Sequence, residues 1–562
     1  MIGSRKVSFI VYLTDPEEAW DPASDGGALE LYPLVSVSSS STSSPSHGNG
    51  DGGGGGDEGG GGGGDTAALP PPSVAPSALL PPHWNSMAMF VVRPGVSYHS
   101  VQEVTAREGK ARMSISGWYH APEAPRGADS TASLAQLRLG KGQDAVRDHA
   151  PFVDVDVSGE EEEKEEGGGK EEGGGEGEGE GEESAEARAL RLASADPTDR
   201  DLAHLSRFVS AAYLQPRAWA AVRRKFEQDG SVQLHGFLKP ELAKAIALAA
   251  KNADDRDGLG RSEHNNDDEN NNGNNNNNDN DNDNDNDKHN LPRPPPSDYL
   301  VGAKEGWTAV GPPHKQRYLR FEGEAASEEA LREAASPAAG CSPSAAAAIS
   351  TSTSSASDNP GPLLSALRRD LFSSLPFFRL LKQLTTITQL GSAGEARRFR
   401  PGLDYSVAHY GVLTSDPRLD AVLCFVDDGS LKEGKDGKVA NNDGDDDESE
   451  WAAGEVGGFE AYVLGDDDDE GAAAIEAGEG GSGRSKKSKK DDDVAVYKKD
   501  DDGDTGVLNV PAAANCLSLL LRDEGLMRFV KYVSAAAPGS RWDLAMEYKP
   551  QDDDDDEEEE EK

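Results

Sequence analysis

The N-terminal part of the chain shows the alternation of apolar and polar residues that is typical of β-strands. The first strand is predicted over Lys6 to Leu13, where Val7, Phe9 and Val11 fall on one face. Because no helical spacing separates the short strands that follow, residues 1–125 are predicted to form an antiparallel sandwich or jelly roll. Those further strands, bounded by Gly or Pro, are expected over 28–32, 87–92, 96–104 and 112–119.

The C-terminal part has a different order, in which helical spacing comes before the strands. Residues 201–550 are therefore expected to form a second folded unit, with the stretch 307–318 as a loop. Helices are predicted over 216–226, 240–249, 364–371 and 377–384, and residues 202–213 lead into the first of them. Strands are predicted over 232–238, 405–413, 421–426, 457–464, 507–510, 516–522 and 542–548.

Low-complexity blocks interrupt both units, and none of them shows apolar periodicity. They are rich in Ser and Gly, in Glu and Gly, in Asn and Asp, or in Ala and Ser. Such compositions bury too little apolar surface to offset the entropy of ordering. We therefore predict a disordered acidic linker over 126–200, disordered insertions over about 254–298, 324–358, 427–450 and 465–505, and an acidic tail over 551–562.

The formal net charge of the chain is −47, and most of it comes from these insertions and the tail. A surface with this charge disfavours direct binding of nucleic acid. The acidic runs are interpreted as solvated, self-repelling segments. The alternative, in which they hold a basic ribosomal or histone-like partner, stays open.

Cysteine usage and apolar runs bear on the compartment. The three cysteines form no CxxC pair, which argues against a disulfide framework or a zinc site and fits a reducing environment. No segment approaches the roughly 18 apolar residues of a membrane span. The basic patch Gly483 to Lys490 resembles a nuclear import signal, so a cytoplasmic location, a nuclear location or both are expected. The sequence does not determine the oligomeric state.

Two residues near the end of the first unit stand out chemically. Strand geometry places Arg112 and Ser114 on one face and Met113 on the other. An arginine on the inner face of a small barrel would be a buried cation, which is costly unless a carboxylate compensates it. The planar guanidinium suits a bidentate carboxylate, and the Ser114 hydroxyl can donate to the same group. His99 lies in the strand before them.

These segments resemble the catalytic double-stranded β-helix of the 2-oxoglutarate oxygenases. Within that superfamily, the chain is similar to eukaryotic prolyl hydroxylases of the ribosomal-oxygenase type, the prolyl 3,4-dihydroxylase family. The resemblance implies a mixed α+β fold dominated by antiparallel β-structure, in which a partial double-stranded β-helix precedes a second, degenerate one with helices. It rests on Lys6 to Leu13, Gly26 to Tyr32, Trp84-Asn85, Val96 to Val104 and Arg112 to His120.

The resemblance also implies an activity and roles for single residues. His99 would be the distal iron ligand, and Arg112, helped by Ser114, would bind the far carboxylate of 2-oxoglutarate. The implied reaction uses Fe(II), 2-oxoglutarate, O₂ and ascorbate as reductant to hydroxylate a prolyl residue of a small-subunit ribosomal protein, with a role in translation or its termination. The second domain is expected to have lost its metal, since no carboxylate follows His409 and Asn515 stands where a distal ligand is expected.

The chain lacks one element that this chemistry requires. Non-haem iron oxygenases hold the metal with two histidines and one carboxylate, and two of these ligands come from a His-x-Asp or His-x-Glu pair. None of the 11 histidines is followed two positions later by Asp or Glu, so the chain as written is expected to be inactive.

Two explanations of the missing pair compete. We favour an N-terminal truncation, with the pair encoded upstream of Met1, over a true pseudoenzyme. A non-catalytic, partner-binding protein of the same fold is the alternative function. A third interpretation is an acidic scaffold unrelated to the oxygenases.

Overall fold

The computed structural model describes residues 5–35, 70–93, 95–123, 151–157, 184–260, 293–336, 358–408, 417–430, 449–464, 507–523 and 525–551. The chain divides into two compact units. Unit 1 comprises Met1–Gln136 with Gly311–His314, and unit 2 comprises Leu137–Val310 with Lys315–Lys562. The basic patch and most of the predicted insertions and acidic tail lie outside the described residues.

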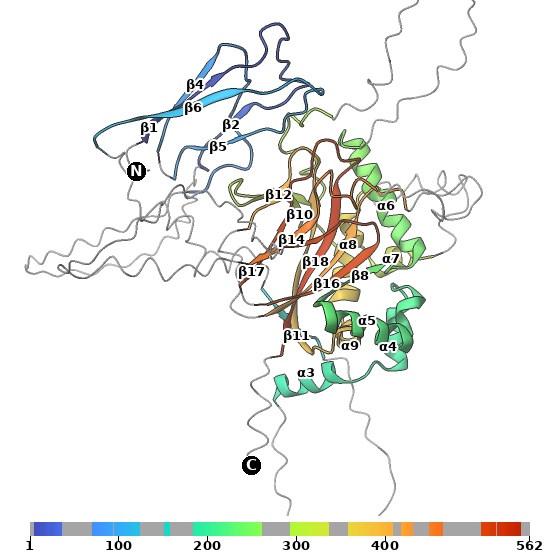
Figure 1. The fold of residues 1–562 in the computed structure, drawn as a ribbon. Coiled ribbons are helices and arrows are strands. Elements are labelled where there is room, and N and C mark those ends of the chain that lie inside the picture. Colours follow the sequence, from blue (N-terminus) through green and yellow to red (C-terminus); the bar gives the residue numbers. More distant parts are fainter. Residues whose placement is uncertain are drawn as a thin grey trace, which may run out of the picture. The chain divides into compact units, whose positions relative to one another are not determined.

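Unit 1 consists of two three-stranded antiparallel sheets, in agreement with the predicted jelly-roll type of fold (Figure 1). One sheet has β1 Arg5–Tyr12 between β4 Met87–Val91 and β6 Ser114–His120. The other has β2 Leu29–Tyr32 between β3 Ala78–Leu80 and β5 Tyr98–Val101. The two sheets share a small core in which Tyr12, Leu29 and Ala88 are buried.

Unit 2 is built on a nine-stranded and a three-stranded sheet. The large sheet has the order β12-β10-β11-β18-β13-β16-β8, with β7 beside β11 and β9 beside β10. Its strands are β7 Val153–Asp154, β8 Ser231–His235, β9 Trp307–Val310, β10 Gln316–Phe321, β11 Gln389–Phe399, β12 Tyr405–Ser406, β13 Arg418–Phe425, β16 Cys516–Arg522 and β18 Arg541–Pro550. The small sheet contains β15 Val507–Val510, β14 Glu460–Leu464 and β17 Leu526–Val530, in this order.

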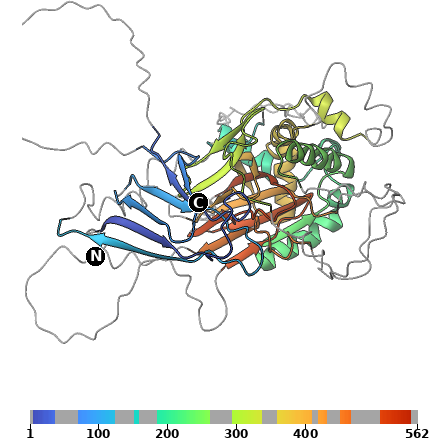
Figure 2. The same cartoon turned by 90° about the horizontal axis from the view of Figure 1, so that it is seen from above.

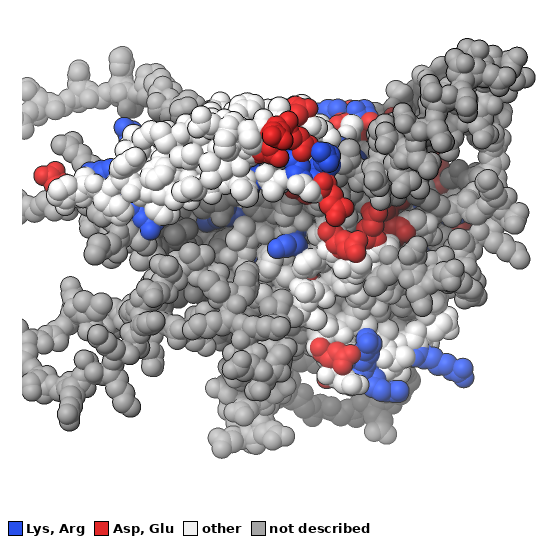
Figure 3. Space-filling view, turned by 45° about the horizontal axis from the view of Figure 1, so that its top comes forward, with Lys and Arg blue, Asp and Glu red and all other residues white. Residues whose placement is uncertain are grey.

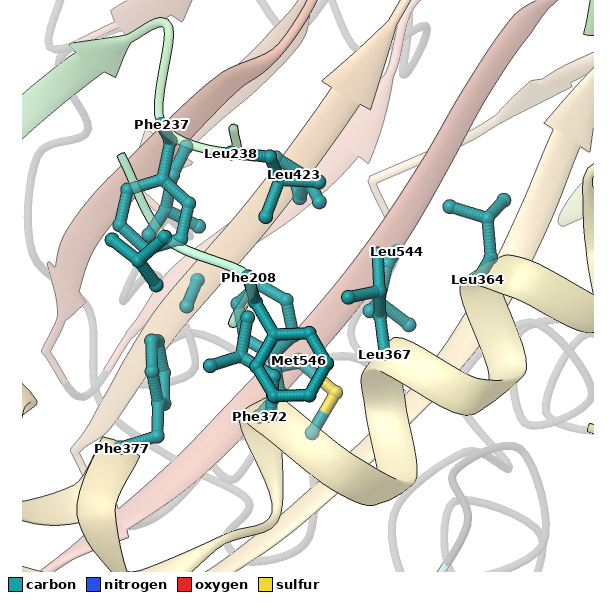
Figure 4. Close-up of a cluster of buried hydrophobic side chains, with 14 of the residues drawn as sticks. Phe208, Phe237, Leu238, Leu364, Leu367, Phe372, Phe377, Leu423, Leu544 and Met546 are labelled. Carbon is teal, nitrogen blue, oxygen red and sulfur yellow. The ribbon is translucent and has the colours of Figure 1, made fainter. Parts of the chain in front are cut away.

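Helices cover the apolar face of the large sheet in unit 2 (Figures 1 and 2). Leu423, Leu544 and Met546 of the sheet pack with Phe372 and Phe377 of the helical layer (Figure 4). Among the described residues, no helix has the length and apolar character to cross a membrane. The α-helices are α3 Ala185–Ser194, α4 Asp199–Leu205, α5 Pro216–Asp229, α6 Pro240–Arg256, α7 Glu328–Ala334, α8 Gly361–Leu367 and α9 Leu375–Thr385, with a 3₁₀ turn at Ala211–Leu214 and a π turn at Arg368–Phe372.

The opposite face of the large sheet carries charged side chains, which are buried within unit 2. Because side chains alternate along a strand, β13 directs Leu419 and Leu423 into the apolar core and Asp420 to the other face. Each cation in this cluster meets a carboxylate, which offsets part of the cost of burial. The charged cluster consists of Arg397, Arg522, Arg528 and Arg541 with Asp420, Glu460, Asp543 and Glu547.

The structure corrects the predicted boundaries of three disordered segments. Part of the linker 126–200 is ordered, because β7 pairs with β11 and the Ser184 side chain caps α3 by accepting from the Ala187 amide. The predicted insertion 254–298 starts too early, since α6 runs on to Arg256. The predicted insertion 324–358 contains α7, which buries Leu331 in the core. Tertiary contacts order these short stretches although their composition is poor in apolar residues.

Several local predictions were wrong as well. The predicted loop 307–318 contains β9 and the first half of β10, and Trp307 packs on Trp542 with ring centroids 5.2 Å apart. Strand β11 was not predicted, because its small and charged residues hide the apolar alternation. Of the strand predicted over 405–413, the structure shows only β12, and residues 409–413 lie outside the described part.

The Asn- and Asp-rich insertion is closed at its base by one arginine. Arg293 Nη1 donates to the Leu259 carbonyl and Nη2 to the Gly260 carbonyl, both at 2.6 Å. Nearby, Arg398 joins β11 to the end of α6 through Asp254 at 2.8 Å and Asp257 at 2.6 Å. The two ends of the segment 261–292 are therefore held together by residues of the folded unit.

The buried charges make unit 2 sensitive to the loss of a single carboxylate. Burial alone raises the pKa of Asp543, but Arg397 and Arg541 outweigh burial and hold that pKa below its ordinary value of 3.8. A carboxyl of this kind stabilises the fold above its unfolded pKa, and the stabilisation is lost as the pH falls through the folded pKa. We expect Asp543→Asn to lower the free energy of unfolding of unit 2 by about 3–5 kcal/mol at pH 7.

This difference should shrink as the pH falls below the unfolded-state pKa of about 3.9, where the stabilisation from the ionised carboxyl begins to be lost. Urea unfolding followed by tryptophan fluorescence at neutral and at acid pH measures it. Asp523→Asn, at an exposed aspartate of the same unit, is the matched control. An equal loss at both pH values would contradict the assigned pKa direction.

Candidate functional site

Arg112 lies just before β6 and turns its guanidinium into unit 1. Its Nε donates to the carbonyl oxygen of Gly27 at 2.7 Å. The guanidinium carbon lies 5.2 Å from the centroid of the Tyr12 ring. The Nη2 atom is buried and has no hydrogen-bond partner among the residues that the structure describes. The predicted inward-facing cation is therefore present, with one donor left unsatisfied.

Tyr12 supplies a second donor beside it. Its side chain is buried, and its hydroxyl also lacks a partner within the described part of the chain. Burial raises the pKa of Tyr12, although the charge of Arg112 and a polar side-chain contact with Arg112 offset part of the shift, so the hydroxyl keeps its proton at neutral pH. An acceptor placed between Tyr12 and Arg112 would satisfy both groups.

Ser114 stands next to this pair. The β1–β6 register places it directly opposite Tyr12, so both side chains occupy the same sheet face. Ser114 is exposed, and its hydroxyl has no hydrogen bond to any described residue. The predicted pair Arg112 and Ser114 is thus brought together with Tyr12. Sequence reasoning missed Tyr12, whose position on the inner face of the first strand was the available signal.

Gly27 makes room for the arginine. Its φ of 67° lies in the left-handed region, which glycine adopts without strain. A Cβ at this position would lie 2.9 Å from Arg112 Cδ and 3.2 Å from Val104 Cγ2. Any side chain here would push the guanidinium out of place, so the glycine is needed for both its backbone conformation and its small size.

His99 lies on β5, in the other sheet of unit 1. Its ring is exposed and contacts Phe90 of β4, with ring centroids 4.7 Å apart. Its Nδ1 is 3.1 Å from the Ser97 carbonyl oxygen, which can only accept, so this hydrogen bond places the proton on Nδ1. The lone pair on Nε2 is then available to a metal.

His99 and the Arg112 group face the same interior. The β2–β5 register sets His99 opposite Leu31, on the face that carries Leu29. Leu29 in turn packs against Tyr12 in the core between the sheets. His99 and Arg112 therefore lie toward the same side of the two sheets, and their roles as ligands stay predictions.

The described residues fit an organic carboxylate better than they fit an iron ion. Two unsatisfied donors and a nearby hydroxyl match the acceptor oxygens of a carboxylate. By contrast, no group of three or more His, Cys, Asp or Glu side chains within the described residues could hold a metal. His99 supplies one of the three ligands that such a centre needs.

In the described part of unit 2, the position of Asn515 shows no comparable site. Asn515, predicted at the place of a lost metal ligand, accepts from the Leu238 amide at 2.9 Å and donates to the Leu238 carbonyl at 3.0 Å. Its amide group therefore holds backbone in place. His409 lies outside the described residues. A cavity of about 810 Å³ lies elsewhere in unit 2, where Arg200, His204 and Asp370 contribute to its lining.

Two protein-family models match parts of the chain and define the class of protein to which it belongs. Residues 66–120 match the 2OG-Fe(II) oxygenase superfamily, so the part of unit 1 that contains His99 and Arg112 has the sequence pattern of these oxygenases. Residues 200–556 match the family described as oxoglutarate and iron-dependent oxygenase degradation C-term. That match covers more than half of the chain, and the chain belongs to this family of two-domain oxygenases.

Individual relatives carry related names. The chain is 27% identical over 550 residues to a prolyl 3,4-dihydroxylase of Ostreococcus tauri, covering 98% of this chain and 74% of that protein. It is 49% identical over 53 residues to a prolyl 3-hydroxylase of Xenopus laevis, covering 9% and 10% of the two chains. A Pseudomonas putida prolyl-4-hydroxylase structure aligns with a TM-score of 0.24 and 13% identity, over 59% of this chain and 99% of the other.

The space that Gly27 leaves for the Arg112 side chain gives a direct test of the position of this arginine. We expect Gly27→Ala to weaken binding of 2-oxoglutarate roughly tenfold or more, the effect of losing a hydrogen bond to a charged group of about 1.5–3 kcal/mol. Gly109→Ala is the control, because Gly109 has a φ of 86° but a Cβ added there would meet no atom within 4 Å. Isothermal titration calorimetry measures both affinities, and equal losses would show that backbone strain alone is responsible.

Proposed function

We propose that this chain is the 2-oxoglutarate-binding and substrate-binding part of a prolyl hydroxylase that acts on a small-subunit ribosomal protein. Arg112 and Tyr12, helped by Ser114, hold the far carboxylate of 2-oxoglutarate. His99 is the distal ligand of Fe(II). When bound, the iron supplies the activation of O₂, and ascorbate keeps the metal reduced.

The buried, unsatisfied donors beside one another carry this proposal. Arg112 Nη2 and Tyr12 Oη are both shielded from solvent. Leaving buried polar groups without partners costs free energy, so a site that keeps two of them is arranged for an acceptor that arrives later. The dianion 2-oxoglutarate brings such an acceptor at one end and leaves its other end free for the metal.

The prolyl substrate is supported by the names of the relatives in Ostreococcus tauri and Xenopus laevis. The charge of the chain supports the ribosomal part of the proposal, because a net charge of −47 favours association with basic proteins. Modification of such a protein would link the activity to translation or its termination. It also fits a cytoplasmic location, a nuclear location or both.

The iron site sets a limit on this chain alone. His99 has no His-x-Asp or His-x-Glu pair to complete it, since no histidine of the sequence stands in such a pair. One imidazole cannot hold iron against water and chelators. We infer that the chain as given binds 2-oxoglutarate without turning it over, and that hydroxylation needs a form of the protein that carries the pair.

Binding of the co-substrate can be measured separately from turnover. We expect Arg112→Lys to weaken 2-oxoglutarate binding at least about tenfold, because an ammonium cannot reproduce the planar fork of the guanidinium. Ser114→Ala should have a smaller effect. The control is Arg107→Lys, at an exposed arginine of unit 1 paired with Glu18 at 2.9 Å. Calorimetry with 2-oxoglutarate and with glutarate reports the affinities, and an unchanged Arg112→Lys affinity would refute the carboxylate site.

Turnover decides the prolyl activity. The chain is incubated with Fe(II), 2-oxoglutarate, ascorbate and small ribosomal subunits, and mass spectrometry follows a 16 Da increase on proline. We expect none from this chain and a clear increase from a form that carries a His-x-Asp pair ahead of β1. If that form also leaves proline unmodified although it binds 2-oxoglutarate, the protein is a non-catalytic partner-binding member of the fold.

A further inference from the structure

The cavity of about 810 Å³ in unit 2 is lined by β7, α4, α7, the start of α9 and one residue of β11. All of its lining residues belong to unit 2. Its volume falls within the range of cavities that bind ligands. Asp154, Asp156 and Arg200 line it and are exposed, so it is open to solvent. We call it the β7 cavity. Figure 3 shows charged side chains gathered on one face of the molecule.

The wall of the β7 cavity carries an excess of negative charge. Five carboxylates and three arginines line it. One of the carboxylates, Asp201, is paired at 2.7 Å with Arg379, which does not line the cavity. With histidine counted as neutral, five negative charges therefore stand against four positive ones. A cavity with this balance favours a cation over an anion.

Strand β7 also presents an open backbone edge. The Val155 amide donates to the Leu390 carbonyl at 3.2 Å, and β7 pairs with β11 alone among the described strands. Because backbone groups alternate in direction along a strand, the amide and carbonyl of Asp154 point away from β11. Neither these groups nor the Asp154 carboxylate has a hydrogen bond to a described residue. An edge of this kind can pair with a further strand.

A buried hydroxyl on the wall lacks a partner as well. Ser392 of β11 is 3% exposed and lines the β7 cavity. The strand register sets it opposite Val153 on one side and Tyr548 on the other. Its hydroxyl has no hydrogen bond to any residue that the structure describes. Since buried polar groups are ordinarily hydrogen-bonded, this hydroxyl is open to a polar group of a guest.

We propose that the β7 cavity binds an extended, basic segment of another protein, which adds to β7 as a further strand. The outward amide and carbonyl of Asp154 pair with the backbone of the segment, as in other cases of strand addition. Its arginine or lysine side chains meet the carboxylates of the wall, and opposite charges on neighbouring strands stabilise the pairing. This inference deepens the proposed function, and rests on it only for the identity of the basic partner.

The composition of the neighbouring chain supports this occupant. Residues 158–183, which follow β7 in the sequence, contain 13 glutamates and two lysines. A segment with this charge is repelled by the negative wall of the β7 cavity. It also adds to the local negative potential, which attracts a basic segment from outside and speeds its association.

Fluorescence anisotropy of a labelled peptide of alternating arginine and threonine tests the site, with the full chain and no iron or 2-oxoglutarate. We expect Asp154→Lys to raise the dissociation constant at least about tenfold, because it sets like charges opposite each other. Asp154→Pro should do the same, because proline removes the outward amide without breaking a bond to β11. Circular dichroism shows that both variants fold.

Asp523→Lys is the matched control, because Asp523 is an exposed aspartate of unit 2 that does not line the cavity. It should change the dissociation constant less than about twofold, as expected of a screened surface charge. A loss equal to that of Asp154→Lys would show that the peptide is held by the overall charge of the chain, which would overturn the proposal. Tighter binding of a glutamate–threonine peptide would overturn it too.

Failure of the wild-type chain to bind the peptide also rejects the proposal. If binding then appears once the lysines of the basic patch are changed to glutamine, the cavity is occupied by the chain's own segment. The lysines are Lys486, Lys487, Lys489 and Lys490. Calorimetry with 2-oxoglutarate on the same proteins is a separate readout of unit 1, so loss of the proposed co-substrate site and loss of the β7 cavity are told apart.

Discussion

Compensation of buried charge is the constraint on which unit 2 depends. The strands of its large sheet carry apolar side chains on one face and charged side chains on the other. Helices cover the apolar face, and the charged face is buried within unit 2 as well. That is possible because Arg397 and Arg541 meet Asp543, while Arg522 and Arg528 meet Asp420 and Glu547. Desolvation of each ion is costly, and only a balanced set can remain inside. The charges of this cluster are thus compensated by side chains of unit 2 itself.

The strands of unit 1 alternate between two faces in the same way, but its inward arginine has no carboxylate partner among the described residues. Arg112 reaches the interior as the charged residues of unit 2 do, but its guanidinium finds a backbone carbonyl and an aromatic ring, and one donor stays unsatisfied within the described residues. A structural interior and a ligand-binding interior then differ in whether the protein or the ligand supplies the anion. In unit 2 the protein supplies it. In unit 1 we assign that part to the co-substrate, and the neighbouring His99 to the metal.

The sequence was informative where one face of a strand is apolar and the other is not. Alternation predicted β1, β2, β4, β5 and β6, and it placed Arg112 and Ser114 on a common inner face. It failed for β11, whose Gly, Ser, Glu and Arg residues are buried through ion pairs and close backbone packing that no local pattern reveals. It also missed Tyr12 as a site residue, because an inward tyrosine in a strand is ordinarily core, and only the missing hydrogen bond distinguishes this one. Composition overextended the disordered segments, since α3 and α7 are held by contacts distant in sequence.

The arginine at the base of the Asn- and Asp-rich insertion has a consequence for how this gene can change. With Leu259 and Gly260 tied to Arg293, the two ends of the insertion stay together whatever lies between them. The entropy of closing a loop grows only slowly with its length. Copying errors that lengthen or shorten the repeated codons would therefore leave the folded unit almost as stable as before. Selection for a stable fold would then act only weakly against expansion of the repeat.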